Sequence, residues 1–310
     1  MKNICELLDI KYPIIQGGMA NIATAEFAAC VSNAGGLGLI GSGGFDENWV
    51  RDEIRKAKTL TKNTFGVNIM LMNPRAKEIA QVVIEEGVKV VTTGAGSPGI
   101  YMAAWKEAGI KVIPVVPSVA LAIRMYRAGA DAIVAEGTEA GGHIGELTTM
   151  ALIPQITDKV PIPVIAAGGI ADKRGVLAAF VLGAKGIQVG TVLLATKEAP
   201  IHQNYKDIII NARDTDTIVT GRDSKAPVRV LKNKMAVEYV RLSGTGIDRL
   251  ELEKMTLGSH RKAVIDGDID GGSFMAGQIA GLITEIKTVK EVIESLFVGI
   301  NEFKDRVEVI

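Results

Sequence analysis

The chain has 310 residues, of which 47% are hydrophobic, and this length suits a large barrel with an appendage. Its 35 basic residues equal its 35 acidic residues, so the composition argues against a nucleic-acid partner. Cys5 and Cys30 lack CxxC and metal-ligand spacing, and the acidic N-terminus lacks the apolar core of a signal peptide, so a cytoplasmic protein without membrane contacts is expected.

Short apolar runs alternate with amphipathic segments eight times along the first 200 residues. The runs are rich in Val and Ile and are nearly continuous in apolarity, which is typical of strands buried on both faces. Strands are predicted at residues 13–16, 38–41, 65–70, 88–92, 111–116, 132–135, 164–166 and 186–189. Helices are predicted at residues 23–33, 47–60, 75–86, 99–108, 119–128, 150–158 and 173–182, with a last one after Thr191.

Glycines stand where several of these helices should stop, at Gly35, Gly87, Gly109, Gly129 and Gly183. Eight consecutive strand–helix units in about 200 residues predict the α/β class and a closed (β/α)8 TIM barrel. An open doubly wound sheet is the alternative. It is disfavoured because the eight units follow one another without a break.

The pattern changes after Pro200. Residues 201–272 are more polar, show no strong strand period, and have helical patterns at 201–213, 234–242 and 248–264. We therefore predict a small, mostly helical cap domain inserted after the eighth strand. Residues 273–310 are glycine-rich and then helical, and are expected to return to the barrel of residues 1–200.

Glycines follow three predicted strands directly, in Gly17-Gly18, Gly168-Gly169 and Gly190 before Thr191. In a barrel the loops after the strands gather on one face, and the loops after strands 7 and 8 are a common phosphate site. Backbone N–H groups of glycine can approach a phosphate closely, and the Thr191 hydroxyl can donate to it. The alternative is that these glycines only make tight turns.

Two polar residues stand at the ends of apolar strands. Asn68 is an amide near the end of the third strand, and Glu136 follows the sixth. Because buried polar groups need partners, Asn68 either bonds neighbouring backbone or binds a ligand edge, and we favour the ligand. Glu136 either accepts from hydroxyls of a sugar-like chain or pairs with a basic neighbour.

His143 lies in a glycine-flanked loop, Glu136-Gly137-Thr138-Glu139-Ala140-Gly141-Gly142-His143-Ile144-Gly145. Its imidazole can exchange a proton near neutral pH, so it is the candidate catalytic residue, with an ordinary surface histidine as the alternative. His202 and His260 fall in the polar appendage, where we expect structural roles. Three scattered histidines without a carboxylate cluster predict no catalytic metal.

Four of these motifs together, residues 16–20, 66–70, 136–145 and 166–170, resemble the flavin-dependent nitronate monooxygenase and enoyl reductase superfamily. Within it, residues 90–96, 112–120, 147–150 and 267–278 are most similar to enoyl-acyl carrier protein reductase II. The resemblance covers nearly the whole chain and is weakest over residues 220–255, which look short for this family.

The resemblance implies FMN as cofactor and His143 as the catalytic histidine. The residues it implies for FMN, together with those expected from their positions, are Gly18, Met19, Ala20, Asn68, Glu136, Gly141, Gly168, Gly169, Gly190, Thr191, Met275, Gly277 and Gln278. It also implies NADH or NADPH as hydride donor, an enoyl substrate carried on acyl carrier protein, and a homodimer.

The expected reaction is therefore the reduction of trans-2-enoyl thioesters in type II fatty-acid synthesis. Nitronate monooxygenase activity is the nearest alternative. A phosphate-sugar isomerase or lyase is disfavoured, because this chain has no lysine at a strand end that could form a Schiff base. A non-enzymatic flavin-binding or phosphate-binding module is the remaining possibility. Acyl carrier protein is acidic, and the basic residues expected to meet it are Arg222, Lys225, Arg229, Lys232 and Lys234, unless they form only a solvated face.

Overall fold

The computed structural model describes residues 3–304, and its largest sheet has eight strands. They are β1 (Ile14–Gln16), β2 (Gly38–Gly41), β3 (Phe65–Met70), β4 (Val90–Gly94), β5 (Lys111–Val116), β6 (Ile133–Glu136), β8 (Val164–Ala167) and β9 (Gly186–Val189). Their order is β1-β9-β8-β6-β5-β4-β3-β2, and every pairing is parallel. A further parallel bridge joins Ile15 to Leu37, just before β2. The sheet therefore closes as a (β/α)8 barrel, which confirms the predicted fold and excludes the open sheet.

Successive side chains of the barrel strands point to two different cores. Ile15, Leu39 and Ile165 belong to a cluster inside the barrel, whereas their neighbours Ile14 and Val164 pack outward against helices. Strands buried on both faces need apolar residues at both positions of the pleat. This is why the runs that predicted them show no alternation.

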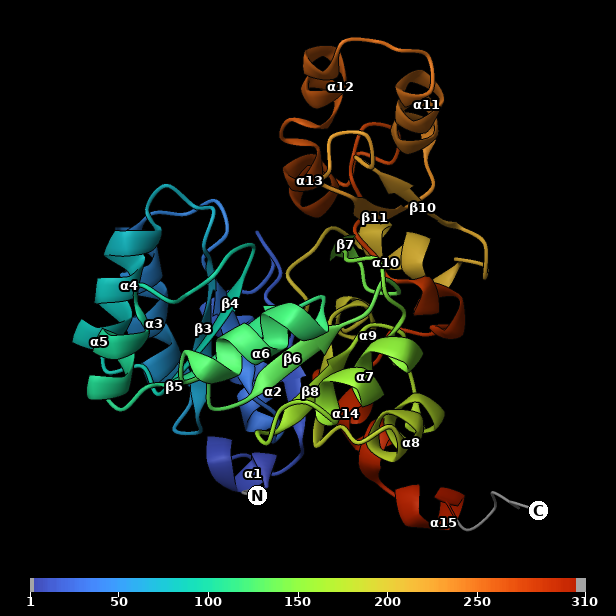
Figure 1. Ribbon diagram of the computed structural model, residues 1–310. Coiled ribbons are helices and arrows are strands. Elements are labelled where there is room, and N and C mark those ends of the chain that lie inside the picture. The colour runs from blue at the N-terminus through green and yellow to red at the C-terminus, as the bar shows by residue number, and fades with distance from the viewer. Residues whose placement is uncertain (1–2, 305–310) are drawn as a thin grey trace.

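Helices cover the outside of the barrel (Figure 1). They are α2 (Ala25–Asn33), α3 (Glu47–Leu60), α4 (Ala76–Glu85), α5 (Met102–Glu107), α6 (Val119–Arg127), α7 (Thr149–Thr157), α8 (Lys173–Val181), α9 (Thr191–Leu194), α14 (Val289–Phe297) and α15 (Ile300–Lys304). The short helix α1 (Ile4–Leu8) adds Ile4 and Leu8 to the interior cluster of the barrel. The five predicted stop glycines all have positive φ, as a left-handed helix end requires.

Residues 201–272 hold both helices and strands. The helices are α10 (Gln203–Ile210), α11 (Lys234–Ser243), α12 (Arg249–Thr256), α13 (Ser259–Arg261) and the π-helix η1 (Lys262–Asp266). The strands β10 (Thr217–Thr220) and β11 (Val228–Leu231) form an antiparallel hairpin that also pairs with β7 (Gly142–His143). The prediction of a mostly helical segment did not include β10 and β11, because each strand has only four residues and shows no strong period of its own.

The cap helices α11–α13 lie beyond this small sheet, on the side of the barrel away from α1 (Figure 1). The helix predicted over residues 248–264 is divided at Gly258, which has a φ of 71°. Tyr205 and Ile209 of α10 belong to the same core cluster as the outer face of the barrel. The division into a barrel and a cap at residues 201 and 272 therefore stays a prediction.

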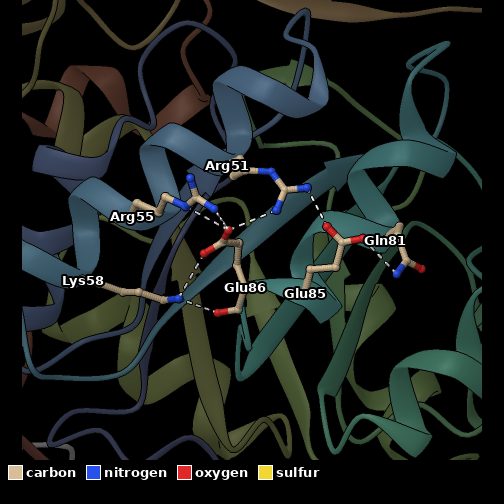
Figure 2. Close-up of polar contacts among 6 residues, drawn as sticks. All are labelled: Arg51, Arg55, Lys58, Gln81, Glu85 and Glu86. Atoms are coloured by element: carbon tan, nitrogen blue, oxygen red, sulfur yellow. Dashed lines mark hydrogen bonds and ion pairs between the residues drawn. The ribbon is translucent and has the colours of Figure 1, made fainter.

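An ion-pair cluster ties α3 to α4 on the outside of the barrel (Figure 2). The Glu86 carboxylate, 9% exposed, contacts Arg51 at 3.1 Å, Arg55 at 2.8 Å and Lys58 at 3.3 Å. Burial raises the pKa of Glu86, but its hydrogen bonds to these cations outweigh burial and hold the pKa below its usual range. The cluster lies outside the cavity described below, and we assign it a structural role.

No helix within residues 3–304 combines the length and apolar character needed to cross a membrane.

Candidate active site

A cavity of about 530 Å³ opens at the carboxyl ends of the barrel strands. Its volume is in the range of cofactor and small-ligand sites. The predicted residues that line it are Gly18, Met19, Ala20, Asn68, Glu136, Gly141, His143, Gly168, Gly169, Gly190, Thr191, Met275 and Gly277. Gln278 is exposed and is not part of the lining; its backbone N–H donates to the Glu139 carbonyl, so its proposed cofactor contact stays a prediction.

Glycines let backbone segments meet closely around this cavity. A Cβ on Gly18 would collide with the Asn68 side chain, whose Nδ2 donates to Thr92 Oγ1 at 2.8 Å. A Cβ on Gly141 would lie 2.6 Å from the Ala276 backbone, and one on Gly277 would lie 2.6 Å from the Glu139 oxygen. The loop after β6 and the returning segment at residues 275–277 therefore pack backbone against backbone.

The loops after β8 and β9, the anion cradle that the sequence predicts, bring their glycines and Thr191 to the cavity wall. Gly168 and Gly169 have φ angles of 87° and 77°, a pair of conformations that side chains with a Cβ rarely adopt. Gly190 has a φ of −121° and a ψ of −67°, outside the helical and extended regions, and a Cβ there would meet only Met19 Sδ, at 3.6 Å. Thr191 Oγ1 accepts from Gly277 N–H at 2.9 Å, which leaves its own hydrogen available to donate.

Polar side chains without protein partners point to a polar ligand in the cavity. Glu136 ends β6, and burial raises its pKa from 4.5 to about 7. Gln188, on β9, also lines the cavity, and its buried Oε1 accepts no hydrogen bond from the residues that the structure describes. Gln188 was not predicted as a site residue because it lies inside an apolar strand. Buried polar atoms of this kind normally have partners, and ligand hydroxyls are suitable ones.

His143 is held at the mouth of the cavity by strand pairing. It lies in β7, where it pairs with Val228 of β11, and its side chain is partly open to solvent. Burial lowers the pKa of His143 from its ordinary value of 6.5. At neutral pH the imidazole is therefore mainly neutral, with one nitrogen free to accept a proton and the other to donate one.

Two residues of the cap also line the cavity, and sequence analysis assigned neither of them to the site. The ring nitrogens of His260 lie 2.9 Å from the Ala20 carbonyl oxygen and 3.2 Å from that of Ser273. The Tyr205 hydroxyl donates to the Met275 carbonyl at 2.8 Å. Both side chains thus hold loops that line the cavity. His260 and Ala20 are 240 residues apart, so no local sequence signal could have linked them.

Arg229 does not belong to an exposed basic surface, as the sequence had suggested. It is only 6% exposed, and its guanidinium donates to the Thr138 carbonyl. Arg222, Lys225, Lys232 and Lys234 are exposed. The basic stretch therefore divides into a buried arginine next to the His143 loop and four solvated cations.

A closed barrel with glycine loops, unpaired polar groups and a histidine around one cavity is typical of barrel enzymes that bind a cofactor or small ligand. Residues 2–299 match the family model described as nitronate monooxygenase, and the chain belongs to this family of FMN-dependent oxidoreductases. A probable nitronate monooxygenase of Staphylococcus aureus (strain JH9) is 36% identical, covering 91% of this chain and 92% of that one.

Two solved structures extend the comparison. FabK from Thermotoga maritima has a TM-score of 0.96 and 47% identity, covering 99% of this chain and 98% of that one. The nitroalkane oxidase from Streptomyces ansochromogenes has a TM-score of 0.87 and 25% identity, covering 98% and 99%. The likeness to enoyl reductases and nitronate monooxygenases predicted from the motifs is therefore confirmed at the level of the family.

The cavity fits FMN in its chemistry. A single phosphate suits the glycine cradle at Gly168, Gly169 and Gly190, which line the cavity without side chains. A chain of hydroxyl groups suits the Glu136 carboxyl group and the buried Oε1 of Gln188. Gly17 and Gly18 line the cavity and carry no side chain, which suits a planar ring.

Proposed function

We propose that this protein is an FMN-dependent enoyl-acyl carrier protein reductase that uses NADH or NADPH in fatty-acid synthesis. The observation that carries the proposal is the 47% identity to FabK over 99% of the chain, together with a histidine at the cavity mouth. The motifs at residues 147–150 and 267–278, which resemble the reductases, support the same choice.

The residues of the cavity have separate tasks in such a reaction. When bound, FMN supplies the hydride chemistry. Hydride addition to the β-carbon of a trans-2-enoyl thioester leaves an enolate, which needs one proton at its α-carbon. We assign that proton to the imidazole of His143. The glycine loops hold the cofactor, and Tyr205 and His260 keep its surrounding loops in place.

The nitronate monooxygenase reaction is the second candidate. Relatives at 36% identity carry that name, and burial lowers the pKa of His143, which favours a base over an acid at neutral pH. The two roles give opposite pH profiles. A general acid works through the protonated imidazole, so its rate falls as the pH rises through the lowered pKa, whereas the rate of a base rises.

A variant at His143 tests the proposal. His143→Ala should leave flavin reduction by NADH or NADPH within about twofold, because that step needs no protein acid. Reoxidation of the flavin by an enoyl thioester should slow by about 10²–10⁴-fold, and its rate should no longer decrease as the pH rises. Stopped-flow absorbance of the flavin measures both steps. Reoxidation at the wild-type rate would remove His143 from the chemistry.

We also propose that acyl carrier protein docks beside His143, on the turn that joins β10 and β11. Val228 pairs with His143, so this turn lies directly next to the cavity mouth. Arg222 and Lys225 of the turn are exposed, and an acidic carrier complements them.

A further inference from the structure

We propose that Arg229 is a positioning residue for His143, which it serves by clamping the loop that leads to the histidine. Arg229 does not line the cavity, so it does not touch the reacting groups itself. It acts on the backbone that carries His143. The proposal concerns the placement of the histidine and holds for either candidate reaction; only its readout rests on the proposed function.

The first observation is the hydrogen bonding of the guanidinium. Its Nε and Nη2 donate to the same carbonyl, that of Thr138, at 3.1 and 3.0 Å. Its Nη1 donates to Thr217 Oγ1 at 3.2 Å, on the neighbouring strand β10. This fork joins the hairpin to the loop between Glu136 and His143, two residues that both line the cavity. A lysine has no planar fork and cannot reproduce this geometry.

The second observation is the place of Arg229 in β11. This strand pairs Arg229 with Gly142 and Val228 with His143, and Ile144 N–H donates to the Pro227 carbonyl at 3.1 Å. Further along the same edge, Val230 bridges to Met275, and Leu231 N–H donates to the Phe274 carbonyl at 2.8 Å, because β10 occupies the other edge of β11. Strand β11 thus binds two segments of the cavity wall along one edge and sets their relative position.

The third observation is the cost of the arrangement. Arg229 is 6% exposed, and among residues 3–304 no carboxylate lies within ion-pair distance of it. Burial and the charge of Arg222 lower the pKa of Arg229, while the charge of Glu139 partly opposes this. A buried cation bound mainly to a backbone carbonyl is expensive. If this position served only for packing, an apolar side chain would avoid the desolvation cost of a buried cation. The hydrogen bonds of the clamp therefore explain why an arginine is present.

A double-mutant cycle with His143 tests the clamp. Arg229→Gln should slow reoxidation of the flavin by an enoyl thioester about tenfold or more and leave flavin occupancy and reduction by NADH or NADPH within about twofold. In the His143→Ala protein the same substitution should have no further effect. Arg229→Lys should behave like Arg229→Gln, whereas the control Arg241→Gln, at an exposed arginine of the cap helix α11, should match the wild type.

The midpoint of the pH profile is a second readout. Loosening the loop removes more of the protein around the partly desolvated imidazole, so the apparent pKa assigned to His143 should rise toward 6.5 in Arg229→Gln. Equal slowing in the wild-type and His143→Ala backgrounds, or wild-type rates in a folded Arg229→Gln protein, would overturn the proposal.

A milder variant covers the case in which Arg229→Gln does not fold. Thr217→Val removes only the contact to Arg229 Nη1 and should slow flavin reoxidation severalfold. This effect should also disappear in the His143→Ala background. Slowing that persists in that background contradicts the clamp. If the wild type fails to turn over enoyl thioesters, the proposed function fails, and the same cycle is measured with an alkyl nitronate.

Discussion

Glu136 carries a carboxyl group whose neutral form burial favours, so that it ionises only near pH 7. Burial raises its pKa to about 7 in the folded protein from 4.5, so its favourable contribution to folding is present below pH 4.5 and is lost as the pH rises toward 7. Glu136→Gln removes this loss. Without cofactor, the variant should gain about 2–3 kcal/mol of unfolding free energy relative to the wild type between pH 5 and pH 8.

Urea unfolding of both cofactor-free proteins at the two pH values measures this difference. The pKa of His143 is lowered, so its contribution to folding stability increases as the pH rises, opposite to that of Glu136. Because His143 is present in both proteins, this contribution cancels from the comparison. A difference between the two proteins that does not change with pH would show that Glu136 is ionised throughout.

At the scale of residues, the sequence indicated those that follow barrel strands directly. Glu136, His143 and Gly190 could be predicted because parallel strands bring their carboxyl ends to one face. Gln188 and His260 could not. Gln188 is hidden in an apolar strand, and His260 reaches Ala20 only through the folding of the cap. Arg229 was misread because a charged residue in a polar stretch normally faces water.

At the scale of elements, the junction of β9 and α9 allows a clean test of the anion cradle. Gly190 has a negative φ of −121°, and a Cβ there would meet only Met19 Sδ, at 3.6 Å, unlike Gly169 with its φ of 77°. Gly190→Val should therefore avoid left-handed strain, and its methyl groups in the cradle should lower FMN occupancy about tenfold or more. Gly169→Val, in contrast, carries backbone strain and loses stability as well.

Flavin absorbance per chain after purification, combined with a thermal melt, measures this effect. Gly94→Ala is the matched control, because Gly94 lines the same cavity at the end of β4 and a Cβ there meets nothing within 4 Å. Full flavin occupancy in Gly190→Val would place the phosphate elsewhere.

The barrel strands were predictable as elements because eight buried parallel strands repeat the same apolar signal. β10 and β11 were not, since each is four residues long; β10 pairs only with β11, which in turn pairs with β7 and bridges to Met275. Short strands of this kind depend on tertiary contacts, which local sequence does not encode.

At the scale of the whole molecule, the charge is balanced, so recognition of an acidic carrier depends on a local surface. Replacing Arg222 and Lys225 together by glutamate should raise KM for enoyl-acyl carrier protein about tenfold and leave KM for the coenzyme A thioester unchanged. Lys159 and Lys185 are exposed and lie before β8 and β9, at the opposite face of the barrel. Replacing these two lysines by glutamate is the matched control and should leave both KM values unchanged. Equal effects on both substrates would contradict docking at this turn.

The choice between reductase and monooxygenase decides the function of the whole molecule, and one experiment addresses it directly. The wild-type flavoprotein is reduced with NADH or NADPH under anaerobic conditions and then mixed with a trans-2-enoyl thioester. We predict rapid return of the flavin absorbance with one saturated thioester formed per flavin and no need for oxygen. Flavin that stays reduced with the thioester, in a protein that oxidises an alkyl nitronate with oxygen, would contradict the reductase assignment.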